Sequence, residues 1–278
     1  MKTLLLTILC FLSISIAVNA QTFLPRLSLA GGGQYTYQVN VADTIKQKMN
    51  NTDIIFPSAY SATIKFVVPK VTNNNLLNVT ASYSNVSSVF QLRGRDTTIA
   101  VTGNKSSSKN YTYATGGMLL THGLLVNDPQ GITSNLENNF ISCRIFSDIP
   151  ATATVIGSKW TTQQTDTIYS VALGGKITVS SKTNLTYSTT KTIQNTTYAV
   201  IDYTAGVSLL GKNTIDGAVI NITGQGNRAG QMLIDMQNGL IYVDRNTLAL
   251  SISKSITGNM VMTIPINRQI NYTIQRKN

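Results

Sequence analysis

One segment of the chain has the spacing of a phosphate-binding loop. Residues 206–212 read Gly-Val-Ser-Leu-Leu-Gly-Lys, which approaches the P-loop pattern of two glycines and a lysine. That motif needs a Ser or Thr after the lysine to bind magnesium, and this chain has Asn213 there. It also needs a helix to follow, whereas residues 214–223 alternate as a strand does. We therefore predict a strand that ends in a Gly-Lys-Asn turn, and no nucleotide cofactor.

Acidic side chains are scarce, since Asp and Glu together number 11. The best-spaced pair is Asp235 and Asp244, which flank the turn signal Asn238-Gly239 and would share one face of a hairpin about 7–8 Å apart. Two carboxyl groups at roughly that distance suit an inverting glycosidase. No aromatic platform surrounds them, and aspartates at turns and edges are usually structural. We therefore expect no catalytic residues and no enzyme activity.

His122 and Cys143 are the remaining candidates for catalysis or metal binding. Neither lies in a cluster with the spacing of metal ligands. His122 lies in the apolar segment 119–126, and Cys143 lies between Ile141 and Ile145, a setting typical of a small buried side chain. The sequence therefore predicts no metal site and no cofactor.

The first twenty residues have the features of an export signal. Lys2 supplies the positive charge, and the run from Leu4 to Val18 is apolar apart from Thr and Ser. Val18-Asn19-Ala20 places small residues before a cleavage site. We expect cleavage near Ala20 and a location in the periplasm or at the cell surface. No later segment approaches the ~18 apolar residues of a membrane-spanning helix, so we expect no transmembrane helix in the mature chain.

Cysteine usage agrees with a bacterial envelope. Cys10 would leave with the signal, so Cys143 would be alone and no intramolecular disulfide could form. Small domains that follow a eukaryotic secretory route are usually stapled by disulfides. We therefore expect export in a bacterium.

The chain is basic but sparsely charged. Lys and Arg number 22, which gives a net charge of +11, yet charged residues are only 12% of the chain. A diffuse positive charge attracts anionic surfaces such as lipopolysaccharide or acidic glycans. A nucleic-acid-binding protein would concentrate its positive charge and interleave it with aromatic residues. We expect an anionic envelope surface as a partner, and no nucleic acid.

Alternation of apolar and polar residues dominates the chain and predicts strands. It is clearest near the C-terminus, where one predicted face carries Met260, Met262, Ile264, Ile266, Arg268, Ile270, Tyr272 and Ile274. Pro265 cannot donate to a ladder, which predicts an edge strand or a bulge there. Further strands are predicted over 35–46, 60–71, 76–90, 97–102, 196–209 and 214–223. One short connecting helix is predicted over 133–143.

Three turn signals predict hairpins in which apolar residues lie opposite one another. Across residues 257–259, the predicted pairs are Ile256 with Met260, Ile252 with Ile264 and Leu250 with Ile266. Across Asn238-Gly239, they are Met236 with Ile241 and Ile234 with Val243. Across residues 174–176, they are Leu173 with Ile177 and Val171 with Val179. In each hairpin one face is apolar, so a slip of one residue would break the match.

The two halves of the chain share a pattern. Tyr35 follows a Gly-x-x pattern that recurs before Trp160, 125 residues later, and Asp-Thr-Ile recurs at 43–45 and 166–168. We predict a signal peptide at 1–20, a first β repeat at 21–130, a connector at 131–155 and a second β repeat at 156–278. The fold would be mostly β, with long antiparallel strands from two related repeats in a curved sheet, a half-barrel or a sandwich.

Four short motifs occur in order along the chain. They are Pro150, Gly-x-x-Trp at 157–160, Gly-x-Gly at 224–226 and Asp-x-x-x-Gly at 235–239. In these motifs the chain loosely resembles a family of exported bacterial proteins, often lipoproteins, that carry a domain of unknown function. The resemblance implies an extracytoplasmic, β-rich domain over residues 30–278, and it implies no activity. The chain departs from the family in lacking the usual lipobox cysteine.

The continuous apolar face of the long strands leads to the functional prediction. We predict an exported, non-catalytic binding protein that holds a lipid or another hydrophobic or amphipathic ligand on the apolar face of a curved sheet. The residues expected to contact that ligand are Tyr35, Trp160, Met232, Met236, Met260 and Met262, because thioethers and aromatic rings adapt to apolar partners. If the apolar faces form a solid core instead, these are core residues. The alternative function is a structural or adhesive surface module that binds glycans or protein partners through its polar, basic outside.

Overall fold

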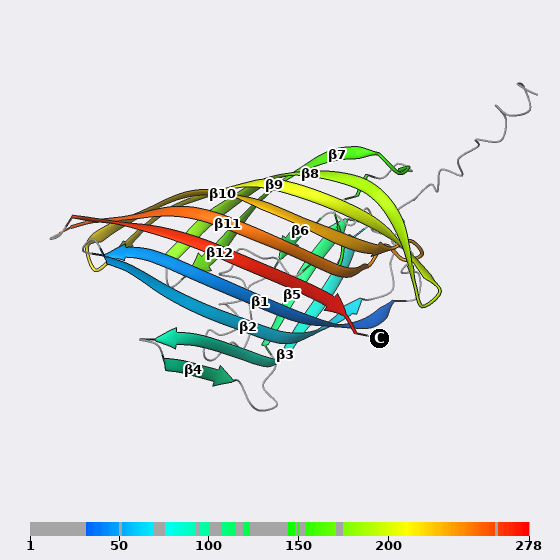
Figure 1. Ribbon diagram of the computed structural model, residues 1–278, viewed down its shortest axis with the longest axis horizontal. Coiled ribbons are helices and arrows are strands. Elements are labelled where there is room, and N and C mark those ends of the chain that lie inside the picture. The colour runs from blue at the N-terminus through cyan, green and yellow to red at the C-terminus, as the bar shows by residue number, and fades with distance from the viewer. Residues whose placement is uncertain are drawn as a thin grey trace, which may run out of the picture.

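The computed structural model describes the chain from residue 32 to residue 277, with gaps. The described residues are 32–49, 52–68, 76–92, 95–100, 107–114, 119–122, 144–147, 149–150, 154–170, 175–258 and 261–277. Twelve strands form one sheet (Figure 1). The prediction of a mostly β protein is confirmed.

Most of the strands are much longer than the usual five or six residues. Their bounds are β1 (Gly33–Met49), β2 (Thr52–Val68), β3 (Leu76–Leu92), β4 (Arg95–Ala100), β5 (Ser107–Ala114), β6 (Leu119–His122), β7 (Lys159–Ser170), β8 (Gly175–Ile193), β9 (Thr196–Ile215), β10 (Ala218–Asp235), β11 (Ile241–Thr257) and β12 (Met262–Arg276). The 20 residues of β9 span about 66 Å at about 3.3 Å per residue. The strands run this long because the apolar-polar alternation, rich in Thr, Val, Ile and Tyr, continues without a break.

The strands form two antiparallel meanders that meet at β1 and β12. The order across the sheet is β6-β5-β3-β2-β1-β12-β11-β10-β9-β8-β7, and β4 pairs with β3 beside this path. The β1–β12 ladder runs from the Tyr37–Arg276 pair to the Gln47–Ile266 pair. In Figure 1 the blue β1 lies next to the red β12. Among the described residues, the first and last strands therefore join in the middle of one continuous sheet. The predicted curved sheet is confirmed, and the pairing of β1 with β12 was not predicted.

One face of the sheet is apolar and the other is polar. In β9, from Ile201 to Leu209, every second residue is buried and the residues between are exposed. In β12, Ile266, Ile270 and Tyr272 are buried on the face that the sequence predicted. The apolar face carries the core. The other face is open to solvent except near the β10–β11 turn, where Tyr198, Val200, Leu233 and Val243 form a small buried cluster.

Residues 144–147 cross the apolar face and identify it as the inner, concave one. Phe146 pairs with Leu240 in an isolated bridge, and its ring meets the Tyr113 ring edge-on with 4.9 Å between centroids. Tyr113 belongs to β5 and Leu240 directly precedes β11, and four strands lie between β5 and β11 in the sheet. Because the one residue Phe146 reaches both places, Leu240 through its backbone and Tyr113 through its ring, the sheet is curled around its apolar face as a half-barrel.

The register of the β11–β12 hairpin differs from the prediction by two residues. Ile256 pairs with Met262 rather than with Met260, and Ile252 pairs with Ile266. Side chains alternate with a period of two, so a shift of two residues keeps the apolar faces together. The predicted faces were therefore right, and the predicted three-residue loop was too short.

Pro265 does not mark an edge strand, because β12 lies between β1 and β11. The β1–β12 ladder nevertheless stops at Ile266, one residue before Pro265 is reached. Pro265 therefore lies where β12 pairs with β11 alone and has no ladder on its β1 side.

The β10–β11 hairpin contains a bulge that the prediction missed. The register shifts between Leu233 and Ile234, so Ile234 pairs with Ile241 rather than with Val243. Met236 was predicted to face Ile241 and instead lies in the turn beyond β10. The two-residue Asn-Gly turn was therefore wrong, because the chain uses a longer turn here.

The β7–β8 hairpin also has a longer loop than predicted. Ile177 pairs with Ile168 instead of Leu173, and Val179 pairs with Asp166. The strands end at Ser170 and Gly175, which form the last pair of the ladder. The predicted register for this hairpin was wrong.

Several predictions concern residues outside the described ranges. These are the signal peptide at 1–20, the helix at 133–143, Met260 and Cys143. The domain boundaries and the two-repeat relationship stay predictions. Tyr35 and Trp160, which open the two predicted repeats, lie near the starts of β1 and β7.

Candidate binding groove on the outer face

Two rows of outward-facing side chains cross seven neighbouring strands. Each row consists of residues that lie directly opposite one another in the ladders from β7 through β12 to β1. The first row is Thr165, Ser180, Ser208, Gln225, Ser251, Asn267 and Lys46. The second row is Gln163, Lys182, Gly206, Asn227, Ala249, Gln269 and Thr44. Because the rows are two residues apart in every strand, they run side by side across the polar face.

An open groove of about 1090 Å³ follows these two rows and is lined by all of their members. Its middle is open because Gly206 and Ala249 lie on either side of Asn227 in the second row. A Cβ added at Gly206 would meet nothing within 4 Å. No aromatic ring and no carboxylate from the described residues lines the groove. Its chemistry is that of hydroxyl, amide and ammonium groups.

Hydrogen bonds between neighbouring strands hold part of the groove floor in place. The hydroxyl oxygens of Thr165 and Ser180 lie 3.1 Å apart. The Ser251 hydroxyl donates to the Asn267 side-chain oxygen at 2.9 Å. These side chains are thus oriented by their cross-strand partners before any ligand binds.

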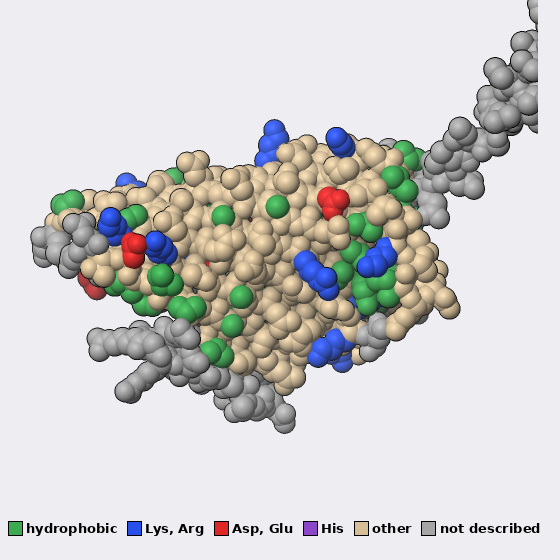
Figure 2. All heavy atoms as spheres, in the orientation of Figure 1, with side chains coloured by type: hydrophobic (Ala, Val, Ile, Leu, Met, Phe, Trp, Pro, Cys, Tyr) green, Lys and Arg blue, Asp and Glu red, His purple; other side chains and the backbone are tan. Residues whose placement is uncertain are grey.

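Two lysines lie toward opposite ends of the groove. Lys182 belongs to β8 and Lys46 belongs to β1, five strand steps away, or about 24 Å at about 4.8 Å per step. Lys46 also pairs with Asp53 at 2.9 Å, and both side chains are about half exposed. Figure 2 shows that neutral polar groups cover most of the face toward the viewer, with scattered charged and hydrophobic side chains. The groove is therefore neutral along its floor and cationic toward its ends.

A second hollow of about 360 Å³ lies on the same face beside the groove. It is lined by outward residues of β12, β1, β2 and β3, among them Asn40, Ser61, Ser87, Asn271 and Thr273. Thr273 pairs with Asn40 and Asn40 with Ser61, so these residues form another row across the sheet. The polar surface therefore extends from β7 to β3.

A buried ion pair lies on the inner side of the sheet, beneath the groove. Arg268 donates from Nη2 to Oδ2 of Asp43 at 2.5 Å, and the side chains are 8% and 0% exposed. Burial raises the pKa of the Asp43 carboxyl, although the Arg268 guanidinium acts to lower it. Arg268 lies between Asn267 and Gln269 of the groove, so the pair fixes β12 to β1 directly under the two rows.

A second inner polar cluster surrounds Asp244. The Tyr203 hydroxyl donates to Oδ1 of Asp244 at 2.7 Å, and the Asn246 amide lies 3.4 Å from the same oxygen. Burial raises the pKa of the Asp244 carboxyl, while Tyr203, Asn246 and the charge of Arg228 act to lower it. Burial also raises the pKa of the Tyr203 hydroxyl well above its usual value, and Asp244 adds to that rise.

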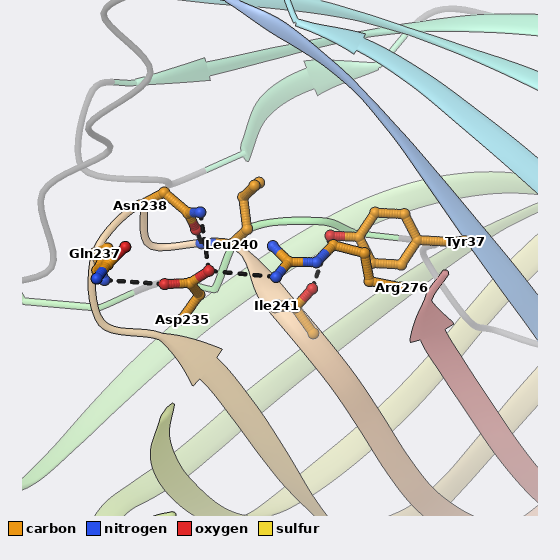
Figure 3. A network of polar contacts seen from close by, with 7 residues as sticks. All are labelled: Tyr37, Asp235, Gln237, Asn238, Leu240, Ile241 and Arg276. Atoms are coloured by element: carbon orange, nitrogen blue, oxygen red, sulfur yellow. Dashed lines mark hydrogen bonds and ion pairs between the residues drawn. The ribbon is translucent and has the colours of Figure 1, made fainter. Parts of the chain in front are cut away.

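Asp235 organises the β10–β11 turn (Figure 3). Its carboxylate accepts a hydrogen bond from the Asn238 amide at 2.9 Å and lies 3.3 Å from Nη2 of Arg276 at the end of β12. Close by, the Tyr37 hydroxyl of β1 donates to the Ile241 carbonyl at 2.7 Å. The network ties four strands together, so the role of Asp235 is structural.

The sequence hypotheses on catalytic motifs are resolved by these positions. Asp235 and Asp244 do not share a face, because Tyr242 is an extra residue of β11 in the β10–β11 ladder and changes the assumed register. Each aspartate also binds a separate set of partners. The P-loop-like segment lies within β9, which continues to Ile215, so its strand assignment is confirmed. The predicted Gly-Lys-Asn turn was wrong, and the turn follows at Asp216 and Gly217, both with positive φ.

The residues predicted to bind a hydrophobic ligand divide between two clusters. Tyr35 packs against the larger core. Trp160 and Met236 pack against a smaller cluster in which Met232 is buried at 7% exposure. Met262 is half-buried at the start of β12. The structure brings Trp160, Met232 and Met236 together and places Tyr35 elsewhere.

The groove residues were not among the residues predicted from the sequence. The signal for them is the polar half of the alternation, which is almost free of charge and rich in Ser, Thr, Asn and Gln. In the sequence, these polar residues look like ordinary solvent-exposed strand surface. Only the strand order and register show that they form two aligned rows across the sheet. In the described residues, no group of three or more His, Cys, Asp or Glu side chains could hold a metal ion.

Comparisons with known proteins identify no family. No family model and no curated protein matches the chain. Among solved structures, the chain is similar to an outer membrane channel from Pseudomonas putida F1, at 8% identity and a TM-score of 0.20, over 87% of this chain and 95% of that one. With a TM-score this low, the likeness carries no inference about function. Within the described residues, no helix has the length and hydropathy needed to cross a bilayer.

Proposed function

We propose that the protein is an exported, non-catalytic binding module and that the outer groove binds an acidic glycan. The observation that carries the proposal is the pair of registered rows, which present hydroxyl, amide and ammonium groups on one sheet. Hydroxyl and amide groups both donate and accept hydrogen bonds, as recognition of sugar hydroxyls requires. Lys46 and Lys182 supply positive charge for the carboxylate or sulfate groups of such a polymer. Export to the envelope, predicted from the N-terminal sequence, would bring the groove to this ligand.

A hydrophobic ligand on the apolar face is less well supported. The buried members of the larger core cluster are each no more than 6% exposed, so this part of the inner face is filled by the chain's own side chains. The polar face, by contrast, offers an open groove of about 1090 Å³. The geometry therefore favours the glycan-binding alternative over the lipid-binding one, which stays a prediction.

Titration with an acidic and a neutral polysaccharide tests the proposal. We expect the purified protein to bind alginate in a salt-dependent way, because exposed charges are screened as ionic strength rises, and to bind dextran more weakly. The double variant Lys46→Glu/Lys182→Glu should weaken alginate binding about tenfold or more, which corresponds to about 1.4 kcal/mol or more. Binding is measured by calorimetry at two salt concentrations.

A matched control separates the groove from overall charge. Lys65 and Lys191 are exposed and do not line the groove. The variant Lys65→Glu/Lys191→Glu makes the same change in net charge, and we expect it to bind alginate as the unmodified protein does. Equal losses in the two double variants, or no binding of alginate at all, would overturn the proposal.

A further inference from the structure

A small polar cavity lies inside the half-barrel, on the opposite face of the sheet from the groove. Its volume is about 100 Å³, and it lies beneath the edge strand β7 and beside residues 144–147. Arg144, Arg228, Asp244 and Tyr203 line it, together with hydroxyl and amide groups of β7 and β8. A polar cavity of this size holds several water molecules, or one small oxyanion.

The charges around the cavity favour an anion. Two arginines, Arg144 and Arg228, line the cavity together with a single carboxylate, that of Asp244. A guanidinium group can donate two parallel hydrogen bonds to a planar or tetrahedral oxyanion. The Tyr203 hydroxyl donates to Oδ1 of Asp244 at 2.7 Å, so one oxygen of this carboxylate already has a hydrogen-bond partner.

The other side of the cavity is apolar. Leu185, Met232 and Ile241 line it there and belong to the cluster against which Trp160 packs. An oxyanion that carries an alkyl chain would thus find an apolar surface next to its charged group. The same cavity chemistry serves a free oxyanion and the acidic end of an amphipathic molecule.

We propose that this cavity is a binding site for one carboxylate, phosphate or sulfate group, held by Arg144 and Arg228. The cavity lies on the other side of the sheet from the outer groove, and Gln164 and Ser181 border both. The charge of Arg228 acts on Asp244, so Asp244 competes with the anion for that arginine, and burial raises the pKa of the Asp244 carboxyl. Loss of the Asp244 charge should therefore strengthen anion binding.

Calorimetric titration with sulfate, phosphate, acetate and decanoate at constant ionic strength tests the site. We expect one oxyanion per chain, at least tenfold weaker binding in Arg228→Gln and in Arg144→Gln, and tighter binding in Asp244→Asn. Decanoate that binds far more tightly than acetate identifies the acidic end of an amphipathic ligand, and equal affinities identify a free oxyanion. Both results support the site.

The control is Arg245→Gln, which removes an exposed arginine next to Asp244 in the sequence. We expect it to bind all four anions as the unmodified protein does. Tighter anion binding by Asp244→Asn is a second readout, because misfolding of the arginine variants could not produce it. No binding of any of the four anions, or equal binding by the arginine variants and the unmodified protein, would refute the site.

Discussion

At the scale of single residues, the most consequential contact is the ion pair between Asp43 and Arg268. Both side chains are buried, and they are 225 residues apart in the chain. Removing one member of a buried pair leaves an uncompensated charge in a medium of low dielectric constant. The cost of that charge is much larger than the net gain from forming the pair.

Asp43→Asn should therefore lower the free energy of unfolding by about 3–5 kcal/mol. The double variant Asp43→Leu/Arg268→Met should recover most of this loss, because two apolar side chains of similar size leave no buried charge behind. Urea denaturation of the three proteins measures both effects. The exposed pair of Lys46 and Asp53 provides the comparison, since Asp53→Asn should cost no more than about 1 kcal/mol. An Asp43→Asn variant as mild as Asp53→Asn would contradict this account.

The sequence predicted half of this contact. Alternation along residues 260–274 placed Arg268 on the apolar face, and the structure confirms it. The partner Asp43 was not predicted, because the diagonal contact depends on the β1–β12 register, in which Arg268 faces Ile45 and Asp43 faces Ile270. Long-range register is set by tertiary packing, which local spacing does not encode.

At the scale of elements, the strands that form the groove come very close to one another at Gly226 of β10. A Cβ added there would overlap the carbonyl oxygen of Ala249 and lie 2.8 Å from a methyl carbon of Leu250. Glycine at this position lets the backbones of β10 and β11 approach closely. The sequence predicted a loop between strands at this Gly-x-Gly motif, and that prediction was wrong, because the motif lies within β10.

Gly226→Ala should therefore destabilise the protein by about 1–3 kcal/mol, the usual range for overpacking against atoms that cannot move aside. Gly206→Ala is the matched control, because its added Cβ meets nothing within 4 Å. That control should be neutral or stabilising by about 0.5 kcal/mol, since alanine reduces the freedom of the unfolded chain. Thermal unfolding distinguishes the two variants. Similar unfolding midpoints for Gly226→Ala and Gly206→Ala would show that the close approach of β10 and β11 at Gly226 does not affect stability.

The registers of the hairpins are the part of the sheet that could not be predicted from the sequence. The predicted β11–β12 hairpin kept its faces although its register was two residues off, because period-two patterns cannot tell such registers apart. The β10–β11 prediction failed at the bulge between Leu233 and Ile234, which alternation alone does not reveal. The outer rows depend on six ladders being in register, so the groove could not be predicted, although alternation placed a few of its residues, such as Asn267 and Gln269, on the polar face.

At the scale of the whole molecule, the half-barrel has a central seam and two ends. The strands β12 and β1 are paired on both sides, whereas β6 and β7 are the last strands of the sheet order in the described residues. Amides of a paired inner strand exchange only when a large part of the sheet opens, and those of an edge strand exchange by local fraying.

Hydrogen exchange followed by mass spectrometry should therefore show a gradient across the sheet. Peptides from β9 to β12 and β1 should be protected longest, and peptides from β7 and β6 should exchange soonest. Uniform protection across the strands would mean that the edges are covered, and would contradict the sheet order as the source of the gradient.

The pairing of β1 with β12 also has a consequence for the newly made chain. β1 ends at Met49 and β12 ends at Arg276, so at about 5–20 residues per second roughly 10 to 45 seconds of synthesis separate them. For that time β1 carries an unfilled edge of main-chain groups, which is the kind of template on which polypeptides aggregate. Lys46 and Lys48 lie in this strand, and their like charges would repel a second nascent copy until the final strand arrives.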